Sequence, residues 1–210
     1  MPYTCMFVSG IKRMVNNSKA ATEHKRNWID LAVEVAARAH RHQLRKGTDI
    51  PYIVHPIGVG LILIRAGCPE EVVAAGILHD ILEDTPVTYE YLRDNFNERI
   101  ADLVTACSEP DRSLSWEERK QHTLEFIKTA PLEVRTIVCA DKLHNLRSIA
   151  ADYRKIGEEL WKRFKRGRPE QEWYYRSVAE TLCDGFENNA PLPLFRQLKQ
   201  EADVFFKSIA

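Results

Sequence analysis

The stretch His79-Asp80-Ile81-Leu82-Glu83-Asp84 decides how the rest of the chain is interpreted. It follows residues 72–78, Val-Val-Ala-Ala-Gly-Ile-Leu, which have the composition of a buried helix. Residues three and four apart share a helical face, so Asp80, Glu83 and Asp84 lie together and His79 lies beside Glu83. Carboxylates next to so apolar a segment are costly to bury unless a cation neutralises them. The stretch therefore predicts a divalent metal site.

Two other stretches carry groups of the same kind, His55-Pro56 upstream and Asp141-Lys142-Leu143-His144-Asn145 downstream. His55, His79, Asp80 and Asp141 together offer two imidazoles and two carboxylates. This set suits Mn, Fe, Co or Zn better than Ca or Mg, and it lacks the thiolates of structural zinc. Each motif alone has a plainer interpretation: a histidine at a helix N-terminus, a surface His-Asp ion pair, and an aspartate paired with Lys142 or Arg147. Because the three occur together, we favour the metal site.

Helical signals cover residues 27–210, and no alternating run predicts a strand, so we expect an all-α fold in one domain. The expected helices run from Trp28 to near Gly47, from Pro56 to Gly67, from Pro69 through Asp80 to Thr85, from Thr88 with a pause at Asn97, from a capping box at Ser115 to Pro131, from Pro131 to about Tyr153, and over about 193–208. Arg45 and Lys46 are then placed at a helix C-terminus, where their charge also complements the dipole. Residues 1–26 form a poorly patterned N-terminal extension, to which we assign no function.

Bulk composition narrows the class of protein. The 210 residues are 44% hydrophobic, and 30 basic residues balance 30 acidic ones, which argues against bulk attraction to nucleic acid or to an anionic membrane. No stretch approaches the roughly 20 apolar residues of a membrane span. The 5 cysteines stand far apart without a C-x-x-C pair, which fits a reducing cytosol. We expect a cytoplasmic protein that binds a small molecule, and we leave self-association open.

The segment 154–176 mixes cations with aromatic residues and has three interpretations. In the first, Lys162, Arg163 or Arg166 helps to hold a polyphosphate tail while Tyr153 or Trp161 flanks a base. In the second, the segment is an amphipathic helix whose aromatic residues pack on the core. Single-stranded RNA binding is the third. We prefer the packing interpretation, and the zero net charge argues against RNA.

Four stretches carry a resemblance to a known family: Arg45-Lys46, Pro51-Tyr52-Ile53-Val54-His55-Pro56, His79-Asp80-x-x-Glu83-Asp84-Thr85, and Ala140-Asp141-Lys142-Leu143-His144-Asn145-Leu146-Arg147. They resemble the HD-domain hydrolases of the RelA/SpoT type, and within these the stand-alone small alarmone hydrolases, over roughly residues 28–185. The resemblance implies a helical HD-domain bundle. It implies that the ligands are His55, His79, Asp80 and Asp141, usually around manganese. Asn97 stands where we expect a glycine in the family.

The resemblance also implies roles around the metal. Glu83 and Asp84 lie beside the attacking water, and one of them takes or relays its proton. The counterparts of Arg45 and Lys46 border the nucleotide base, and Asn145 faces the sugar. Lys142 and Arg147 are close to these motifs, and phosphoryl transfer needs positioned cations, so we expect both to bind substrate.

The activity implied is hydrolysis of the 3′-pyrophosphate of guanosine tetra- and pentaphosphate, the alarmones of the stringent response, to GDP or GTP and pyrophosphate. We expect no synthesis, since the chain has no room for the synthetase domain of the long members. Two alternatives stay open. One is an HD phosphohydrolase acting on another nucleotide, such as an adenosine alarmone or a phosphorylated dinucleotide. The other is a catalytically silent nucleotide-binding HD protein, against which the complete ligand set argues.

Overall fold

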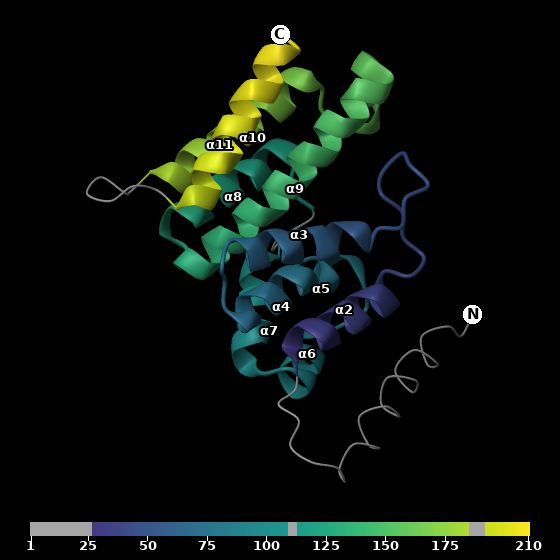
Figure 1. Cartoon of the computed structure of the whole chain (residues 1–210), viewed down its shortest axis with the longest axis vertical. Coiled ribbons are helices and arrows are strands. Elements are labelled where there is room, and N and C mark those ends of the chain that lie inside the picture. The colour runs from purple at the N-terminus through teal and green to yellow at the C-terminus, as the bar shows by residue number, and fades with distance from the viewer. Residues whose placement is uncertain (1–26, 109–112, 185–191) are drawn as a thin grey trace.

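The computed structural model describes residues 27–108, 113–184 and 192–210, and the regular elements in these ranges are helices joined by loops (Figure 1). The helices are α2 Trp28–Ala39, α3 Val54–Arg65, α4 Glu70–Leu78, α5 Ile81–Asp84, α6 Tyr89–Asn95, α7 Glu98–Cys107, α8 Trp116–Thr129, α9 Leu132–Ile156, the 3-10 helix η1 Gly157–Arg163, α10 Arg168–Cys183 and α11 Pro193–Ser208. Extended backbone pairs in these ranges at one isolated bridge, between Leu44 and Pro51. The all-α prediction is confirmed, and the N-terminal extension 1–26 lies outside the described residues.

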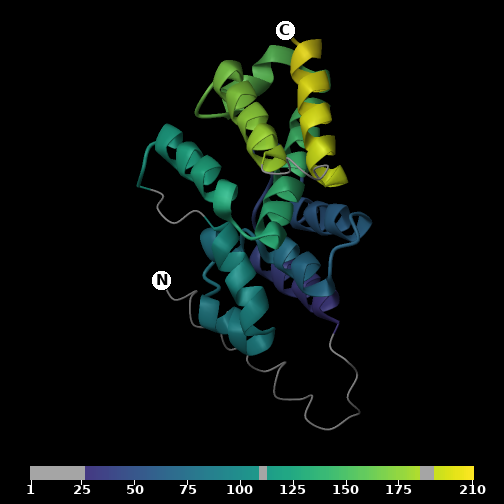
Figure 2. The ribbon, with the colours of Figure 1, turned by 90° about the vertical axis from the view of Figure 1, so that its left-hand side faces the viewer.

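Helix α9, the longest, connects two groups of helices (Figures 1 and 2). Helices α3, α4 and α7 pack against it from one group, and α11, α10 and η1 pack against it from the other. Helix α8 reaches this second group through α10. Helix α4 lies at the centre of the first group, with every residue from Val72 to Leu78 buried, as its uniformly apolar composition predicts. No helix in the described ranges has the length and apolar character to cross a membrane.

Helix α2 ends at Ala39, so the prediction that it continues to near Gly47 is wrong. The chain turns back after His40, whose buried ring lies 4.9 Å from the ring of Tyr52. The main-chain N–H of Tyr52 donates to the carbonyl of Gln43 at 2.9 Å, and the Gln43 side chain donates to the carbonyl of Asp84 at 2.7 Å. Residues 40–46 contain no helix breaker, and tertiary contacts end the helix. Arg45 therefore lies in a loop.

The expected helix from Pro69 to Thr85 is divided at the metal motif. Helix α4 ends at Leu78, His79 caps it, and Asp80 is the N-cap of the short helix α5. Both residues keep right-handed helical backbone angles, although the regular helix is interrupted between them. Their side chains meet at this point, where His79 Nε2 lies 3.0 Å from Asp80 Oδ2.

Other boundaries follow local signals. Ser115 and Glu118 form the predicted capping box of α8, Pro131 precedes α9, and α11 begins at Pro193. Asn97, expected to be a pause in left-handed conformation, is instead an extended N-cap residue with φ of −159°. Its side chain accepts a hydrogen bond from the N–H of Ile100 at 2.8 Å and donates to Glu71 at 2.8 Å.

Candidate metal centre

Helix α3, the turn between α4 and α5, and helix α9 bring all four predicted ligands together. His55 Nε2 lies 3.2 Å from Asp141 Oδ1 and 3.5 Å from Asp80 Oδ2. His79 Nε2 lies 3.0 Å from Asp80 Oδ2 and 3.7 Å from Asp141 Oδ1. His55, His79 and Asp141 are buried, and Asp80 is partly exposed. Two imidazole nitrogens and two carboxylate oxygens therefore converge on one point.

This arrangement fits a divalent cation. One ligand atom each from His55, His79 and Asp141 lies within 4.8 Å of the others. His79 Nε2 is buried and has no hydrogen-bond partner among the described residues, although it faces two carboxylates. A buried polar atom without a partner costs free energy, and coordination to a metal removes that cost. The mixed nitrogen and oxygen donors match a divalent transition metal.

Both imidazoles are oriented through their second nitrogen. His79 Nδ1 lies 2.8 Å from the carbonyl oxygen of Gly76, and His55 Nδ1 lies 2.9 Å from Nδ1 of His144. Metal-binding histidines commonly donate from the second ring nitrogen, which fixes the ring and its tautomer. His144 was part of the sequence motif, but no role was predicted for it.

The carboxylates of Asp80 and Asp141 are also held by hydrogen bonds. Tyr52 Oη donates to Asp80 Oδ2 at 2.5 Å. Lys142 Nζ donates to Asp141 Oδ2 at 2.7 Å, and Asn145 Nδ2 donates to Asp141 Oδ1 at 2.6 Å. Tyr52 was not predicted as a site residue, although it lies within the quoted stretch Pro51–Pro56. Lys142 and Asn145, predicted to bind substrate, thus also contact a predicted ligand.

Opposite charges within the cluster stabilise one another and shift the pKa values of its members. Burial by itself raises the pKa of Asp80, but His79 and His55 outweigh it and hold the pKa of this carboxyl well below its usual range. Burial opposes ionisation of Asp141 too, and Lys142 with the two imidazoles holds its pKa well below the usual value. Burial lowers the pKa of His79, but the carboxylates outweigh it and raise this pKa well above its usual value. A coordinated cation competes with that proton.

Glu83 and Asp84 lie on α5, immediately after the His79–Asp80 break. Glu83 is partly exposed and Asp84 is exposed. Burial and Asp80 raise the pKa of the Tyr52 hydroxyl, and Asp84 adds to this effect. Glu83 adds in the same way to the raised pKa of Cys107, after burial and the carboxylates of Asp141 and Asp80. Both carboxylates therefore lie close enough to act on groups around the centre.

A cavity of about 350 Å³ adjoins the cluster. Its walls include the predicted residues Arg45, Lys46, Lys142 and Asn145, and also Tyr52, Trp116, Lys120, Asp152, Arg163, Phe164, Tyr174 and Tyr175. Arg45 Nη2 donates to Asn145 Oδ1 at 2.7 Å, so a chain of hydrogen bonds runs from this cavity to Asp141. Tyr174 Oη is buried without a hydrogen-bond partner in the described ranges, and Lys120 Nζ lies 5.0 Å from its ring.

The segment 154–176 contributes both to packing and to the cavity. Trp161 is buried, as the packing interpretation predicts. Arg163 lines the cavity and donates to Asp152 at 2.9 Å. Lys162 pairs with Glu159 and Arg166 pairs with Glu117, both at exposed positions, and neither cation lines the cavity. Of the three cations considered for a polyphosphate tail, Arg163 alone is placed at the cavity.

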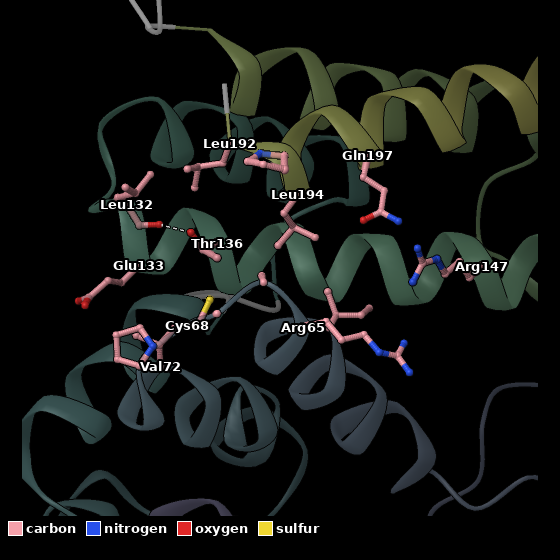
Figure 3. Close-up of a pocket in the computed structure, with 15 residues that line it drawn as sticks. Arg65, Cys68, Val72, Leu132, Glu133, Thr136, Arg147, Leu192, Leu194 and Gln197 are labelled. Carbon is pink, nitrogen blue, oxygen red and sulfur yellow. Dashed lines mark hydrogen bonds between the residues drawn. The ribbon is translucent and has the colours of Figure 1, made fainter. Parts of the chain in front are cut away.

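Arg147 is not brought to this cavity. It lines a second cavity of about 500 Å³ between α3 and α11, together with Arg65, Glu133 and Leu194 (Figure 3). Its guanidinium donates to both carboxylate oxygens of Glu201 on α11, at 2.8 and 2.6 Å. Six residues along a helix make about 1.7 turns, so Arg147 lies on a different face of α9 from Asp141.

Comparisons with known proteins agree with this geometry. The profile of a family described as HD domain matches residues 32–165. A zebrafish (Danio rerio) protein named guanosine-3′,5′-bis(diphosphate) 3′-pyrophosphohydrolase MESH1 is 38% identical over 120 residues, which cover 56% of this chain and 66% of that protein. The match therefore spans just under two thirds of that relative's length. In a longer relative from Aquifex aeolicus it spans 18%.

Two solved structures are also similar. A crystal structure of lmo0812 from Listeria monocytogenes has a TM-score of 0.68 and 40% sequence identity, covering 73% of this chain and 99% of that one. A metazoan ortholog of SpoT, described as hydrolysing ppGpp and as having a role in starvation responses, has a TM-score of 0.67 and 26% identity. That match covers 90% of this chain and 98% of the metazoan chain.

Proposed function

This chain belongs to the HD-domain family, and we propose that it hydrolyses the 3′-pyrophosphate of guanosine 3′,5′-bis(diphosphate) and of the corresponding pentaphosphate. The products are GDP or GTP and pyrophosphate. The observation that carries the proposal is the hydrogen-bonded chain from Arg45 through Asn145 to Asp141, which joins a nucleotide-sized cavity to the candidate metal centre. The names of similar proteins support the same activity.

We assign His55, His79, Asp80 and Asp141 as the ligands of one divalent ion, and manganese as that ion. The two imidazoles and two carboxylates suit it, and His79 Nε2 needs a partner. When bound, such an ion supplies Lewis-acid activation of a water molecule and of a phosphoryl oxygen.

The protein's own groups do the rest. Glu83 or Asp84 accepts or relays the proton of the attacking water, because these carboxylates lie within four residues of Asp80 and are accessible to solvent. The new bond joins the water oxygen to the phosphorus on the ribose 3′ oxygen, and the bond from that phosphorus to the 3′ oxygen breaks. The 3′ oxygen leaves with the proton that the carboxylate took from the water, and becomes the 3′ hydroxyl of GDP or GTP. Lys142, held charged because Asp141 outweighs the effect of burial on its pKa, lies where negative charge develops on the phosphoryl oxygens.

The cavity suits a nucleotide with several phosphates. Arg45, Lys46, Lys120, Lys142 and Arg163 give it five cations against the carboxylate of Asp152, which already binds Arg163. Phosphate groups are bound by positioned cations of this kind, and the aromatic walls offer flat apolar surface to a base. The hydroxyl of Tyr174, which has no hydrogen-bond partner among the residues that the structure describes, offers one more donor.

We propose residues 27–210 as one hydrolase domain with C-terminal helices, and the cytosol as its location. The cysteines of the described ranges, Cys68, Cys107, Cys139 and Cys183, are free thiols, which suits a reducing compartment.

Product analysis with a panel of nucleotides tests the proposal. The manganese-loaded protein should release pyrophosphate from guanosine 3′-pyrophosphates and should be weak or inactive on GTP, GDP and 5′-monophosphates, because these leave no phosphorus in line with the activated water. If adenosine 3′-pyrophosphates are hydrolysed faster than the guanosine compounds, the substrate is an adenosine nucleotide. Orthophosphate release from 5′-nucleotides at comparable rates would overturn the proposal.

A further inference from the structure

His144 on α9 faces His55 on α3 through its imidazole ring. The two Nδ1 atoms lie 2.9 Å apart and the ring centroids 5.0 Å apart. We propose that His144 is a positioning residue that fixes the His55 ring with Nε2 facing the metal, and that Gly58 leaves the space that the His144 ring needs. This inference rests on the metal centre of the proposed function, but it is independent of which nucleotide is the substrate.

The direction of the hydrogen bond follows from proton accounting. Of two facing ring nitrogens, one must donate and the other accept. His55 Nε2 lies at the carboxylates of Asp80 and Asp141, so as a ligand it offers its lone pair there and carries its proton on Nδ1. His144 Nδ1 is then the acceptor, and the His144 proton is on Nε2.

The orientation of the His55 ring therefore depends on a side chain, whereas that of the His79 ring depends on the backbone. The acceptor for His79 Nδ1 is the carbonyl of Gly76, which no side-chain substitution removes. The acceptor for His55 Nδ1 can be removed by changing one residue. A substitution at position 144 should thus act on one ligand and leave the other in place.

Gly58 lies on α3, one turn after His55, beneath the His144 ring. A Cβ atom built at Gly58 would lie 2.1 Å from His144 Nε2 and 2.2 Å from Cδ2. Any side chain at position 58 must therefore displace the ring and break its contact with His55. Glycine inside a helix is less favourable than alanine, so its presence in α3 is explained by this close approach.

Two substitutions of His144 and one control substitution test whether His144 is the hydrogen-bond acceptor for His55. His144→Leu fills similar volume without an acceptor and should weaken Mn²⁺ binding, measured by titration calorimetry and by electron paramagnetic resonance of free Mn²⁺, about 10- to 100-fold. His144→Asn places a carbonyl oxygen near the position of Nδ1 and should stay within a few-fold of wild type. His122→Leu, at an exposed histidine of α8, is the matched control and should bind as wild type does.

A double substitution tests the role of Gly58. Gly58→Ala alone should weaken Mn²⁺ binding as His144→Leu does, while the metal-free protein keeps its unfolding midpoint, since alanine favours the helix. In Gly58→Ala combined with His144→Asn, affinity should return to that of His144→Asn, because asparagine lacks the Nε2, Cδ2 and Cε1 atoms that the new methyl meets.

The outcomes separate the inference from the proposed function. Wild-type affinity in His144→Leu, equal losses in His144→Leu and His144→Asn, or simple additivity of Gly58→Ala and His144→Asn would overturn the positioning role. Wild-type protein that binds no divalent ion would overturn the metal centre itself. Normal metal binding without release of pyrophosphate would contradict the proposed activity and leave the positioning role in place.

Discussion

His79 has two separate contacts at the metal centre. Its Nδ1 is held by the Gly76 carbonyl, and its buried Nε2 faces Asp80 and Asp141 without a hydrogen bond from any residue that the structure describes. A ring held on one side and lacking a partner on the other is ready to bind a cation without reorganisation. Asp141 is held differently, since hydrogen bonds from Lys142 and Asn145 fix both of its oxygens.

We predict that His79→Ala removes the stabilisation of the protein by metal. An ion that binds the native state adds about 2.7 kcal/mol to the free energy of unfolding at 100 times its Kd. Thermal unfolding with and without Mn²⁺ should therefore show a rise in Tm for wild type and almost none for the variant, which should also lose activity. A variant with the full metal-induced rise in Tm would show that His79 is not a ligand.

Glu83→Gln should separate chemistry from binding. The amide cannot accept the proton of water, so turnover should fall by about 10²–10⁴-fold, whereas Mn²⁺ affinity and KM stay near wild type. Steady-state kinetics with a parallel metal titration checks this. If Glu83→Gln and Asp84→Asn both turn over at the wild-type rate, the pair only supports the centre.

Arg45→Ala should raise KM with a smaller effect on kcat. Arg45 lines the cavity and donates to Asn145, which is not a proposed metal ligand, so we expect it to contact bound nucleotide similarly in the ground state and the transition state. Measurement of kcat and KM under saturating Mn²⁺ tests this. A fall in kcat at unchanged KM would place Arg45 in the chemical step.

At the scale of the elements, α3 and α4 meet through glycines. A Cβ atom at Gly76 would lie 2.2 Å from Leu63 Cδ1, and one at Gly60 would lie 2.6 Å from Ile77 Cγ1. The two helices approach closely at these points, and both lead to the candidate metal centre, since α3 carries His55 and α4 is capped by His79. The contact therefore fixes the distance between two proposed ligands.

Gly76→Ala should lower the free energy of unfolding by about 1–3 kcal/mol, as overpacking of a filled core does. Urea unfolding of the metal-free protein measures this. Because the added methyl meets Leu63, combining Gly76→Ala with Leu63→Val should cost less than the sum of the two single substitutions. Strict additivity would show that the two side chains do not compete for the same space.

The elements also show what a sequence can predict. Ser115, Pro131 and Pro193 are local signals whose effect does not depend on the rest of the fold, and the helices they begin were predicted. The ends of α2 at Ala39 and of α4 at Leu78 have no such signal. They depend on the contact of His40 with Tyr52 and on the convergence of His79 with Asp80, which exist only in the folded chain.

In the whole molecule, the residues of the candidate metal centre could be predicted from the sequence, whereas several residues of the adjoining cavity could not. Each ligand lies in a short motif, so the set His55, His79, Asp80 and Asp141 could be chosen before the fold was known. Lys120 and Tyr174 join the cavity because α8 packs on α10 beside α9, an arrangement that no local pattern encodes. Arg147 was chosen by proximity in sequence, but its helical phase turns it toward Glu201.

We propose a metal-dependent 3′-pyrophosphohydrolase, and product analysis in ¹⁸O-labelled water shows which bond it breaks. The protein is incubated with guanosine 3′,5′-bis(diphosphate) and Mn²⁺, and the products are analysed by mass spectrometry. We predict one GDP and one pyrophosphate per substrate, with the labelled oxygen in pyrophosphate, and loss of the reaction when the metal is chelated. Orthophosphate as the product, label in GDP, or an undiminished rate after chelation would contradict the account.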